Sequence, residues 1–398
     1  MVRFKRRLLI ATAVVVLVLL VVGVWLYFSY FASTSTALRH AEAFIFRRMK
    51  VAQLAGQGNY RFFFITNRNL ESNEGPLNKR LGREREEHLK FGYFDARIQP
   101  TVGLGMLINP SEWFENEEIR LKSVNELEQA VFVKQVQKLV QASPYRSLLV
   151  VVHGFREAFE SGLRKTAFVG HVLDIDSPVL VFDWPGNQGS TPPGYLRARR
   201  VAKASGAELA HTLKLIIDEI KPDRLWLIAN SMGAQVVVDA FGLLYREADW
   251  ADAQTEIEDV VLTAPDVDHK EFNNQLKLAL KTMAQKTTVY VSSNDRALLI
   301  SRVINRGKRL GESTMSPDMM EEAVRVANLV DPGSSLIDLV DVTPVNRTRN
   351  FHNFSLETPE FFDELFLRLT NIDVPNHRPM YRIEAPNGSV YWVLTRGR

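Results

Sequence analysis

One serine of this sequence stands where a nucleophile could be held. Ser231 lies in the pentapeptide Ala-Asn-Ser-Met-Gly, which follows the apolar run LWLI and precedes the helix-like run AQVVVDAF. This strand–turn–helix context matches a nucleophile elbow, in which a tight turn exposes the serine oxygen at the start of a helix. The turn needs small residues because it brings two backbones together, and Ala229 and Gly233 supply them. We therefore expect Ser231 to be a nucleophile rather than an ordinary turn residue.

A serine nucleophile needs a general base, and histidine is the usual one. Where a sheet carries such an elbow, the chain order is serine, then acid, then histidine. Three histidines follow Ser231, namely His269, His352 and His377. His269 begins a predicted helix too early in the chain, and His377 lies in the tail. We expect His352 to be the base, because its loop follows the last predicted strand of the main sheet and can return to the serine.

Two aspartates compete for the role of the acid that orients the histidine. Asp266 follows one predicted strand and Asp295 follows the next, so both belong to the same edge of a parallel sheet. We favour Asp295, because the later strand usually supplies the acid in this arrangement, and we keep Asp266 as the alternative. Either aspartate could instead cap the N-terminus of a helix, where this residue type is favoured.

The segment LVVVHGF after another apolar strand predicts the oxyanion hole. A glycine after the strand lets the chain turn back, so that the backbone N–H of Phe155 can face the site. The second donor would be the N–H of Met232, directly after the nucleophile. Such amides act where negative charge develops, and each can be worth about 3 kcal/mol. We expect His153, between the strand and the glycine, to be structural.

The elements around these residues alternate between short apolar strands and amphipathic helices. Strands are predicted at 60–66, 147–152, 178–183, 224–228, 258–263, 287–292 and 336–342, and helices at 123–142, 159–173, 199–220, 232–245, 270–284 and 358–369. Residues 67–87 read as a polar surface loop. This alternation predicts an α/β fold with a mostly parallel central sheet and helices on both faces. Ligand sites in such sheets form beyond the C-terminal ends of the strands.

With these motifs in place, the chain resembles an α/β hydrolase, and more narrowly a bacterial family of such hydrolases catalogued as a domain of unknown function. The resemblance extends from about residue 60 to 369 and implies an eight-stranded sheet, a Ser-Asp-His triad and no cofactor. The family usually has histidine before the nucleophile, where this chain has Asn230. The segments that carry the resemblance are FFFITNRN, LKFGYFDARI, VVVHGFREAFESGLRKTA, VLVFDWPGNQGSTPPGYL, LWLIANSMGAQVVVDAF, LTAPDVDHKEF and VYVSSNDRALLISR.

An apolar segment near the N-terminus predicts a transmembrane helix that anchors the protein. Residues 8–31 carry no charge, could span a bilayer of about 30 Å, and end in aromatic residues that suit its interface. A cleaved signal peptide would have a shorter apolar region of about 7–15 residues. Because basic residues in Met1–Arg7 precede the span, we expect a cytoplasmic N-terminus and a catalytic domain on the periplasmic side.

These readings divide the chain into four parts. We assign residues 1–33 to a basic tip and transmembrane anchor, 34–122 to a juxtamembrane helix and a β-rich extension, 123–372 to the α/β-hydrolase domain, and 373–398 to a C-terminal β-hairpin tail.

Composition narrows the chemistry further. The absence of cysteine excludes disulfides, thiol catalysis and cysteine-ligated metals. A net charge of +3 without a basic stripe does not suggest nucleic acid. The histidines form no metal-binding spacing, so we expect no metal and no cofactor.

Together the motifs predict a membrane-anchored serine hydrolase. We expect it to cleave carboxylic esters or thioesters of a small-molecule or lipid-like acyl substrate. An inactive hydrolase-like binding or scaffold protein of the cell envelope is the alternative, because a fold alone does not establish function. Peptidase activity would use the same triad.

Overall fold

The computed structural model of the chain describes most of the region from residue 50 to residue 395. The described residues are 12, 16–18, 20, 50–56, 58–98, 119–173, 175–247, 250, 257–267, 277–292, 295, 337–346, 354–371, 380–384 and 390–395.

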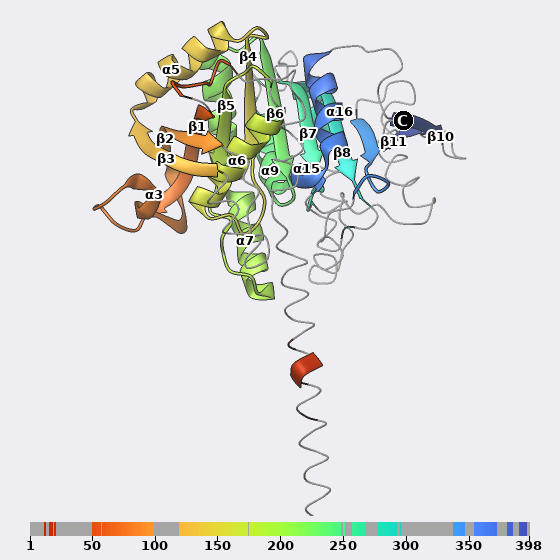
Figure 1. Cartoon of the computed structure of the whole chain (residues 1–398), viewed down its shortest axis with the longest axis horizontal. Coiled ribbons are helices and arrows are strands. Elements are labelled where there is room, and N and C mark those ends of the chain that lie inside the picture. The colour runs from red at the N-terminus through yellow and green to blue at the C-terminus, as the bar shows by residue number, and fades with distance from the viewer. Residues whose placement is uncertain are drawn as a thin grey trace, which may run out of the picture.

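Within these residues, eleven strands form one sheet in the order β10-β11-β9-β8-β7-β6-β4-β5-β1-β2-β3 (Figure 1). Eight neighbouring strands, from β11 to β1, pair in parallel, while β2, β3 and β10 add antiparallel pairs at the two edges. The strands are β1 (Asn59–Leu70), β2 (Leu81–Ile98), β3 (Ile119–Leu127), β4 (Ser147–Val152), β5 (Val179–Asp183), β6 (Arg224–Asn230), β7 (Ile257–Thr263), β8 (Ala284–Val291), β9 (Ile337–Asp341), β10 (Met380–Glu384) and β11 (Val390–Leu394).

Helices cover both faces of the sheet and bury alternate strand residues. Val150 of β4 belongs to one apolar cluster, while its neighbours Leu149 and Val151 belong to the other, as the period of two in a strand requires. The first cluster packs under α5 (Gln129–Ala142), α7 (Pro192–Ala204), α8 (Gly206–Leu215) with its π-helical extension η2 (Ile216–Ile220), α9 (Gly233–Leu244) and α12 (Lys277–Met283). The second packs under α6 (Phe159–Leu173), α15 (Phe354–Glu357) and α16 (Pro359–Thr370).

The structure confirms the predicted α/β class and the mostly parallel sheet. The six strands predicted between residues 147 and 342 are all present, within a few residues at their ends. All six residues of β4 are buried, because a central parallel strand is covered on both faces. The predicted tail hairpin is also present as β10 and β11, and β11 pairs with β9 at the edge of the main sheet.

Three element predictions were wrong. Residues 67–87 are not a surface loop, because they contain the end of β1, the short helix α3 (Leu77–Arg80) and the start of β2. Residues 123–127 are not helical, because they pair with β2 as part of β3. The helix predicted at 199–220 is interrupted between α7 and α8, where a Cβ on Gly206 would lie 2.6 Å from the Cβ of Asp239 on α9.

The N-terminal extension belongs to the same sheet as the rest of the chain. Strand β1 pairs in parallel with β5, from Phe63 opposite Leu180 to Thr66 opposite Asp183. The boundary that the sequence suggested between residues 122 and 123 falls inside β3. Main-chain hydrogen bonds therefore connect the extension directly to the strands that lead to the candidate site.

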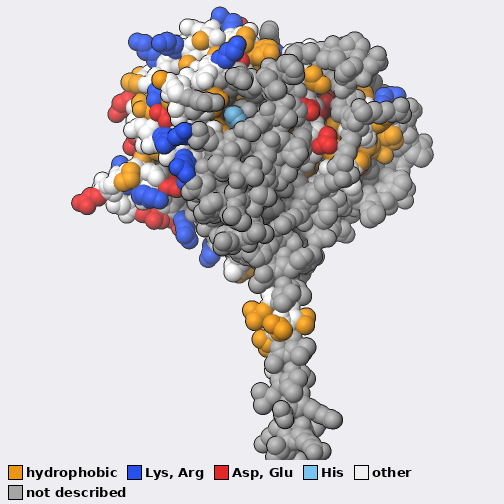
Figure 2. Space-filling model, viewed as in Figure 1, with side chains coloured by type: hydrophobic (Ala, Val, Ile, Leu, Met, Phe, Trp, Pro, Cys, Tyr) orange, Lys and Arg blue, Asp and Glu red, His pale blue; other side chains and the backbone are white. Residues whose placement is uncertain are grey.

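The predicted membrane anchor lies almost wholly outside the described residues. The described part of this segment is helical, and its exposed apolar side chains form a patch in Figure 2; they are Val16, Leu17, Val18 and Leu20. None of the helices in the described part of the chain is long and apolar enough to cross a membrane. The anchor stays a prediction.

Candidate active site

Ser231 occupies a strained turn between β6 and α9. Its φ angle is +52°, in the left-handed region that side chains other than glycine rarely adopt. The Ser231 N–H donates to the carbonyl oxygen of Thr263 at 2.9 Å. Its own carbonyl oxygen accepts from the N–H groups of Ala234, at 3.1 Å, and Asp266, at 3.0 Å. These three hydrogen bonds hold the turn in a conformation that the backbone alone would not favour.

Two glycines let the loop after β4 pack directly against this turn. A Cβ on Gly233 would lie 2.6 Å from the carbonyl oxygens of both Val152 and His153. A Cβ on Gly154 would lie 3.1 Å from Asn230 Oδ1 and 3.2 Å from Ser231 Cβ. The glycine expected at position 233 is therefore required by the close approach of α9 to the end of β4, and Gly154 packs closely against the elbow.

The two predicted oxyanion donors lie on either side of this contact. In the part of the chain that the structure describes, neither the Phe155 N–H nor the Met232 N–H donates to a protein oxygen. Met232 is fully buried, and Phe155 is half-buried with its ring edge-on to the ring of Tyr195 at 5.5 Å. An unpaired N–H in a buried residue costs about 1–3 kcal/mol. The buried Met232 amide follows Ser231 directly, and the Phe155 amide follows Gly154, which packs against the Ser231 side chain. Together they suit a bound oxygen that carries negative charge.

Both candidate acids are buried, and they follow the C-terminal ends of two neighbouring strands. Asp266 follows β7, and one of its carboxylate oxygens accepts a hydrogen bond from the Tyr195 hydroxyl at 2.7 Å. Asp295 follows β8 and is 1% exposed. The start of its loop is tied to the loop after β9, because Ser292 Oγ accepts from Asn346 Nδ2 at 2.8 Å. Asp266 thus has a positioning partner on α7.

The predicted base, His352, lies outside the described residues. Ser355, three residues further on in α15, is tied to the elbow by Asn230, which precedes the nucleophile. The Asn230 amide nitrogen donates to Ser355 Oγ and to Thr263 Oγ1, each at 3.0 Å. This contact of Asn230 could not be predicted, because nothing in the local sequence indicates a bond to a residue 125 positions away.

A comparison of the sequence with protein-family models identifies the family of this chain. The sequence model of a family described as alpha/beta hydrolase of unknown function (DUF900) matches residues 128–366, more than half of the chain. The chain belongs to this family. The resemblance drawn from the sequence motifs is thereby confirmed.

Two solved structures are distantly similar to this hydrolase. An uncharacterized protein from Bacillus cereus ATCC 10987 has 16% identity and a TM-score of 0.35, and the match covers 57% of this chain and 60% of that one. A zinc-bound, cold-adapted esterase from an Arctic intertidal metagenomic library has 11% identity and a TM-score of 0.36, with 80% of this chain and 97% of that one covered. Neither likeness is strong enough to carry an argument about activity. No curated protein matches the chain.

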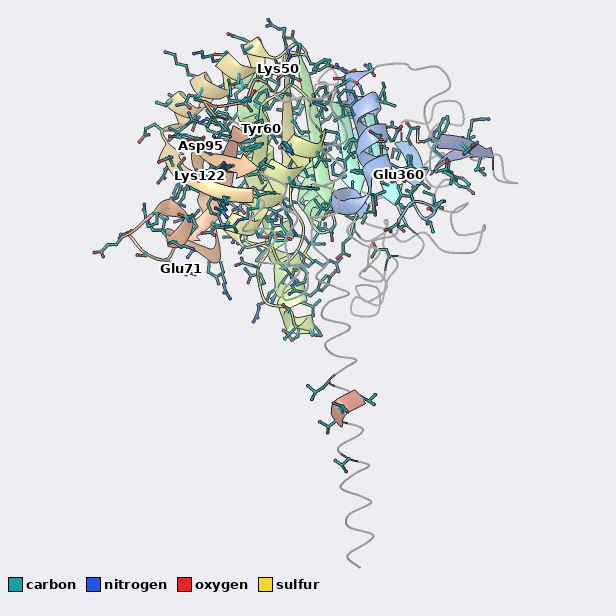
Figure 3. All side chains as sticks on the ribbon, viewed as in Figure 1. Lys50, Tyr60, Glu71, Asp95, Lys122 and Glu360 are labelled. Atoms are coloured by element: carbon teal, nitrogen blue, oxygen red, sulfur yellow. The ribbon has the colours of Figure 1, made fainter. Side chains whose placement is uncertain are left out.

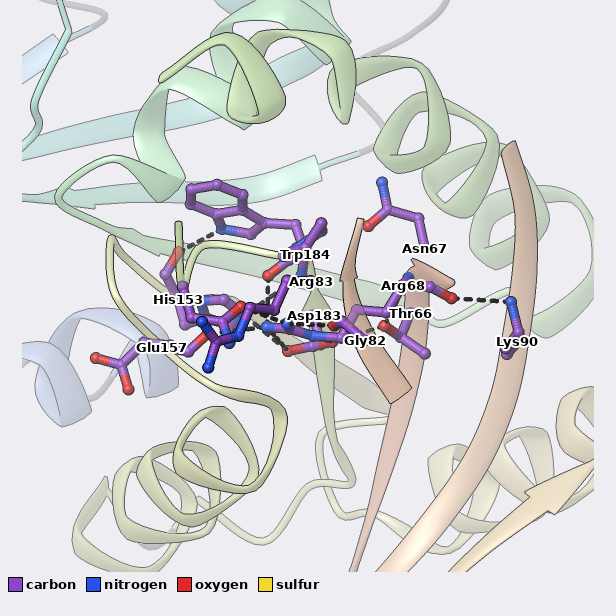
Figure 4. A network of polar contacts seen from close by, with 12 residues as sticks. Thr66, Asn67, Arg68, Gly82, Arg83, Lys90, His153, Glu157, Asp183 and Trp184 are labelled. Atoms are coloured by element: carbon purple, nitrogen blue, oxygen red, sulfur yellow. Dashed lines mark hydrogen bonds and ion pairs between the residues drawn. The ribbon is translucent and has the colours of Figure 1, made fainter. Parts of the chain in front are cut away.

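In this hydrolase, a buried ion pair lies beside His153 and Glu157, the two residues between which Phe155 lies in the chain (Figure 4). Asp183, at the end of β5, accepts from Arg68 Nε at 2.7 Å, from Thr66 Oγ1 at 2.6 Å and from His153 Nε2 at 2.9 Å. Burial alone would raise the pKa of Asp183, but the charge of Arg68 and the hydrogen bonds outweigh it and lower the pKa to about 2. The carboxylate therefore stays charged at any working pH.

His153 has the structural role that the sequence analysis expected. Its ring stacks on Trp184 with 5.7 Å between centroids, and its carbonyl oxygen accepts from Trp184 Nε1 at 2.8 Å. Arg68 and Asp183 were not among the predicted site residues, although an arginine and an aspartate at the ends of apolar strands were a signal. Within the described residues, no group of three or more His, Asp or Glu side chains could hold a metal ion.

Gly233→Ala should destabilise this hydrolase, because the new methyl group would meet two carbonyl oxygens of the neighbouring strand. We expect the free energy of unfolding in denaturant to fall by roughly 1–3 kcal/mol. Gly242→Ala, in the same helix, is the matched control, since no atom lies within 4 Å of its Cβ position. That change should be neutral or stabilise the protein by up to about 1 kcal/mol. Equal stabilities of the two variants would contradict the close contact of β4 with the elbow.

Proposed function

We propose that this chain is a serine hydrolase that cleaves carboxylic esters or thioesters through an acyl-enzyme on Ser231. The observation that carries the proposal is the strained Ser231 together with the amides of Phe155 and Met232, neither of which donates to an oxygen within the described residues. Amides arranged in advance around a developing oxyanion supply one of the largest contributions to catalysis. Any turn from a strand into a helix leaves the first N–H groups of the helix without intrahelical partners, as at Met232. Such a turn needs neither the left-handed serine nor an amide from a second loop, at Phe155, that donates to no oxygen in the described part of the chain.

The proposed reaction has two halves. In the first, Ser231 Oγ bonds to the acyl carbon and its proton passes to His352, which returns it to the alcohol or thiol as the bond to that leaving group breaks. In the second, a water molecule gives a proton to His352 and its oxygen bonds to the acyl carbon. The bond to Ser231 Oγ then breaks, the serine regains a proton from His352, and a carboxylic acid leaves.

The contact between Asn230 and Ser355 supports His352 as the base. Ser355, three positions after His352 in the sequence, is bonded to the residue that precedes the nucleophile. Asp295 is proposed as the acid because it follows β8, the later of the two strands, and Asp266, which follows β7 and accepts from the Tyr195 hydroxyl, is the alternative. In this arrangement Asp266 and Tyr195 together support the elbow and the Phe155 ring.

The membrane anchor at residues 8–31 is part of the proposal. It would hold the catalytic domain on the periplasmic side, where small-molecule or lipid-like acyl substrates could reach it.

Ser231→Ala should lower ester turnover by a factor on the order of 10⁶, because loss of the serine disables a triad as a whole. The measurement is hydrolysis of a panel of acyl esters and thioesters of varied chain length. Ser143→Ala is the matched control, since Ser143 is also buried but lies before β4, at the opposite edge of the sheet. Turnover near the wild-type rate in folded Ser231→Ala would remove the serine from its role. A folded wild-type protein that turns over none of the panel would favour the binding or scaffold alternative.

Asp295→Asn should reduce kcat/KM far more than Asp266→Asn. An amide cannot stabilise the charged form of the base or hold it in the correct tautomer, and a comparable change in a serine protease costs about 10⁴ in kcat. Asp266→Asn keeps an oxygen that can still accept from Tyr195. In wild type, kcat/KM should rise with pH as His352 loses its proton. The assignment of the acid is wrong if Asp266→Asn is the inactive variant and Asp295→Asn behaves like wild type.

Deletion of Met1–Phe31 should move the protein from the membrane fraction to the soluble fraction of expressing cells. The described fold begins at residue 50, and its sheet uses no residue of the deleted segment. The truncated protein should keep its unfolding temperature and its ester turnover. A truncated protein that still sediments with membranes would show that another surface holds it there.

A further inference from the structure

Arg68 lies outside the part of the chain that matches the family, yet it is buried beside the candidate site. It belongs to β1, in the N-terminal extension, and is 1% exposed. Thr66 pairs with Asp183 across β1 and β5, and Arg68, two residues further along, points to the same face of the sheet. This register directs the guanidinium toward the loops that follow β4 and β5 (Figure 4).

All five N–H groups of this guanidinium are engaged, although an ion pair with Asp183 would use only two or three of them. The remaining partners are mostly backbone carbonyls from three segments. Arg68 donates to Gly82 O at 3.1 Å, Asn187 Oδ1 at 2.8 Å, Trp184 O at 2.9 Å and Glu157 O at 2.9 Å, besides both carboxylate oxygens of Asp183. Arg68 therefore fixes the relative positions of β2 and the two loops.

The hydrogen bond from Arg68 to the Glu157 carbonyl oxygen holds one end of the loop that carries Phe155. On the other side, Trp184 Nε1 holds the His153 carbonyl at 2.8 Å. Between them, the Arg156 N–H donates to Gly186 O at 2.9 Å, and Arg156 has a φ of +72°. The loop is thus held on both sides of Phe155, whose N–H donates to no oxygen in the described part of the chain.

Arg68 also contacts the start of the same loop indirectly, through Asp183 and His153. Arg68 neutralises Asp183, and Asp183 in turn binds His153 Nε2 at 2.9 Å. A Cβ on Gly162 of α6 would lie 3.1 Å from the His153 ring, so the ring packs closely against this glycine. One guanidinium therefore acts on both ends of the segment His153–Glu157.

We propose that Arg68 is a positioning residue that sets the Phe155 N–H for the oxyanion, so that the N-terminal extension forms part of the catalytic apparatus. The inference rests on the proposed function, because the oxyanion hole has a role only if Ser231 is a nucleophile. An oxyanion donor has to lie about 2.7–3.1 Å from the charged oxygen, so a small displacement of the loop weakens the transition state.

Arg68→Lys is the test variant, since lysine keeps the positive charge for Asp183 but lacks the planar fork that bridges several acceptors. The kcat for the best ester substrate should fall about 10–100-fold, less than the 10²–10³ lost with a whole oxyanion donor. KM should stay within about twofold, because the donor acts mainly on the transition state. Hydrogen–deuterium exchange should become faster in peptides that contain residues 153–157.

Arg61→Lys is the matched control on the same strand. Arg61 also forms a forked pair with an aspartate, through Nε to Asp95 Oδ1 at 2.8 Å and Nη2 to Asp95 Oδ2 at 2.9 Å. Asp95 lies on β2 in the extension, as Figure 3 shows, and its other bonding partner in the described residues is Ser123 of β3. Arg61→Lys should leave kcat and loop exchange within about twofold of wild type.

A milder variant covers the case in which Arg68→Lys fails to fold. Asn187→Ala removes one acceptor of Arg68 and leaves its charge and its pair with Asp183 intact. It should lower kcat by a smaller factor, with the same direction of change in loop exchange.

Three outcomes would overturn the inference: kcat unchanged in folded Arg68→Lys, kcat reduced without faster exchange of residues 153–157, or an equal loss in Arg61→Lys. In the milder variant, unchanged kcat and unchanged loop exchange would overturn it as well. If the wild-type protein turns over no ester at all, the proposed function is wrong, and Arg68 then has no catalytic role. The exchange comparison would then still decide whether Arg68 holds the loop.

Discussion

The candidate site depends on the left-handed turn at Ser231. A non-glycine residue in this conformation costs roughly 1–2 kcal/mol. The turn persists because Thr263 and Asp266, both from the neighbouring strand β7 and its loop, bind the Ser231 backbone. The turn also requires glycine at position 233, because the end of β4 and the elbow pack too closely there for a side chain to fit between them, and Gly154 packs closely against the elbow. The parallel order of β4, β6 and β7 supplies all of these contacts at one edge of the sheet.

A buried charge network supports the other side of the site. Asp183 and Arg68 are both almost fully buried, and such a pair is tolerated only when its remaining hydrogen-bonding groups are satisfied. Here they are satisfied by Thr66, His153 and several backbone carbonyls. Because these partners come from β1, β2, β4 and β5, the network forms only when the extension has joined the sheet. The family match begins at residue 128, but the network beside the loop after β4 includes residues of the extension, starting with Thr66.

The sequence predicted the elements whose signal is local. Each central strand is a short apolar run, because it is buried on both faces, and each is followed by the polar residues that end it. This pattern was enough to place Asp266 and Asp295 at the same edge as Ser231. It failed for residues 123–127, where an edge strand with mixed polar and apolar residues resembles the start of the helix that follows. It failed also for residues 67–87, because the long strand β2 is strongly charged in its first half.

The contacts that no local pattern could reveal are those between distant segments. Arg68 and Asp183 are 115 residues apart, and Asn230 and Ser355 are 125 residues apart. In the sequence, Arg68 reads as one polar residue in an exposed loop, and Asn230 reads as a departure from a family motif. Their roles follow from sheet order and strand register, which depend on how the whole chain packs.

The most direct test of the account is the structure of the protein after reaction with a fluorophosphonate, which mimics the tetrahedral intermediate on a nucleophilic serine. The account predicts a covalent adduct on Ser231 Oγ, with the phosphonyl oxygen about 2.7–3.1 Å from the backbone nitrogens of both Phe155 and Met232. Folded protein that forms no adduct on Ser231, or an adduct whose oxygen is directed away from these two amides, would contradict it.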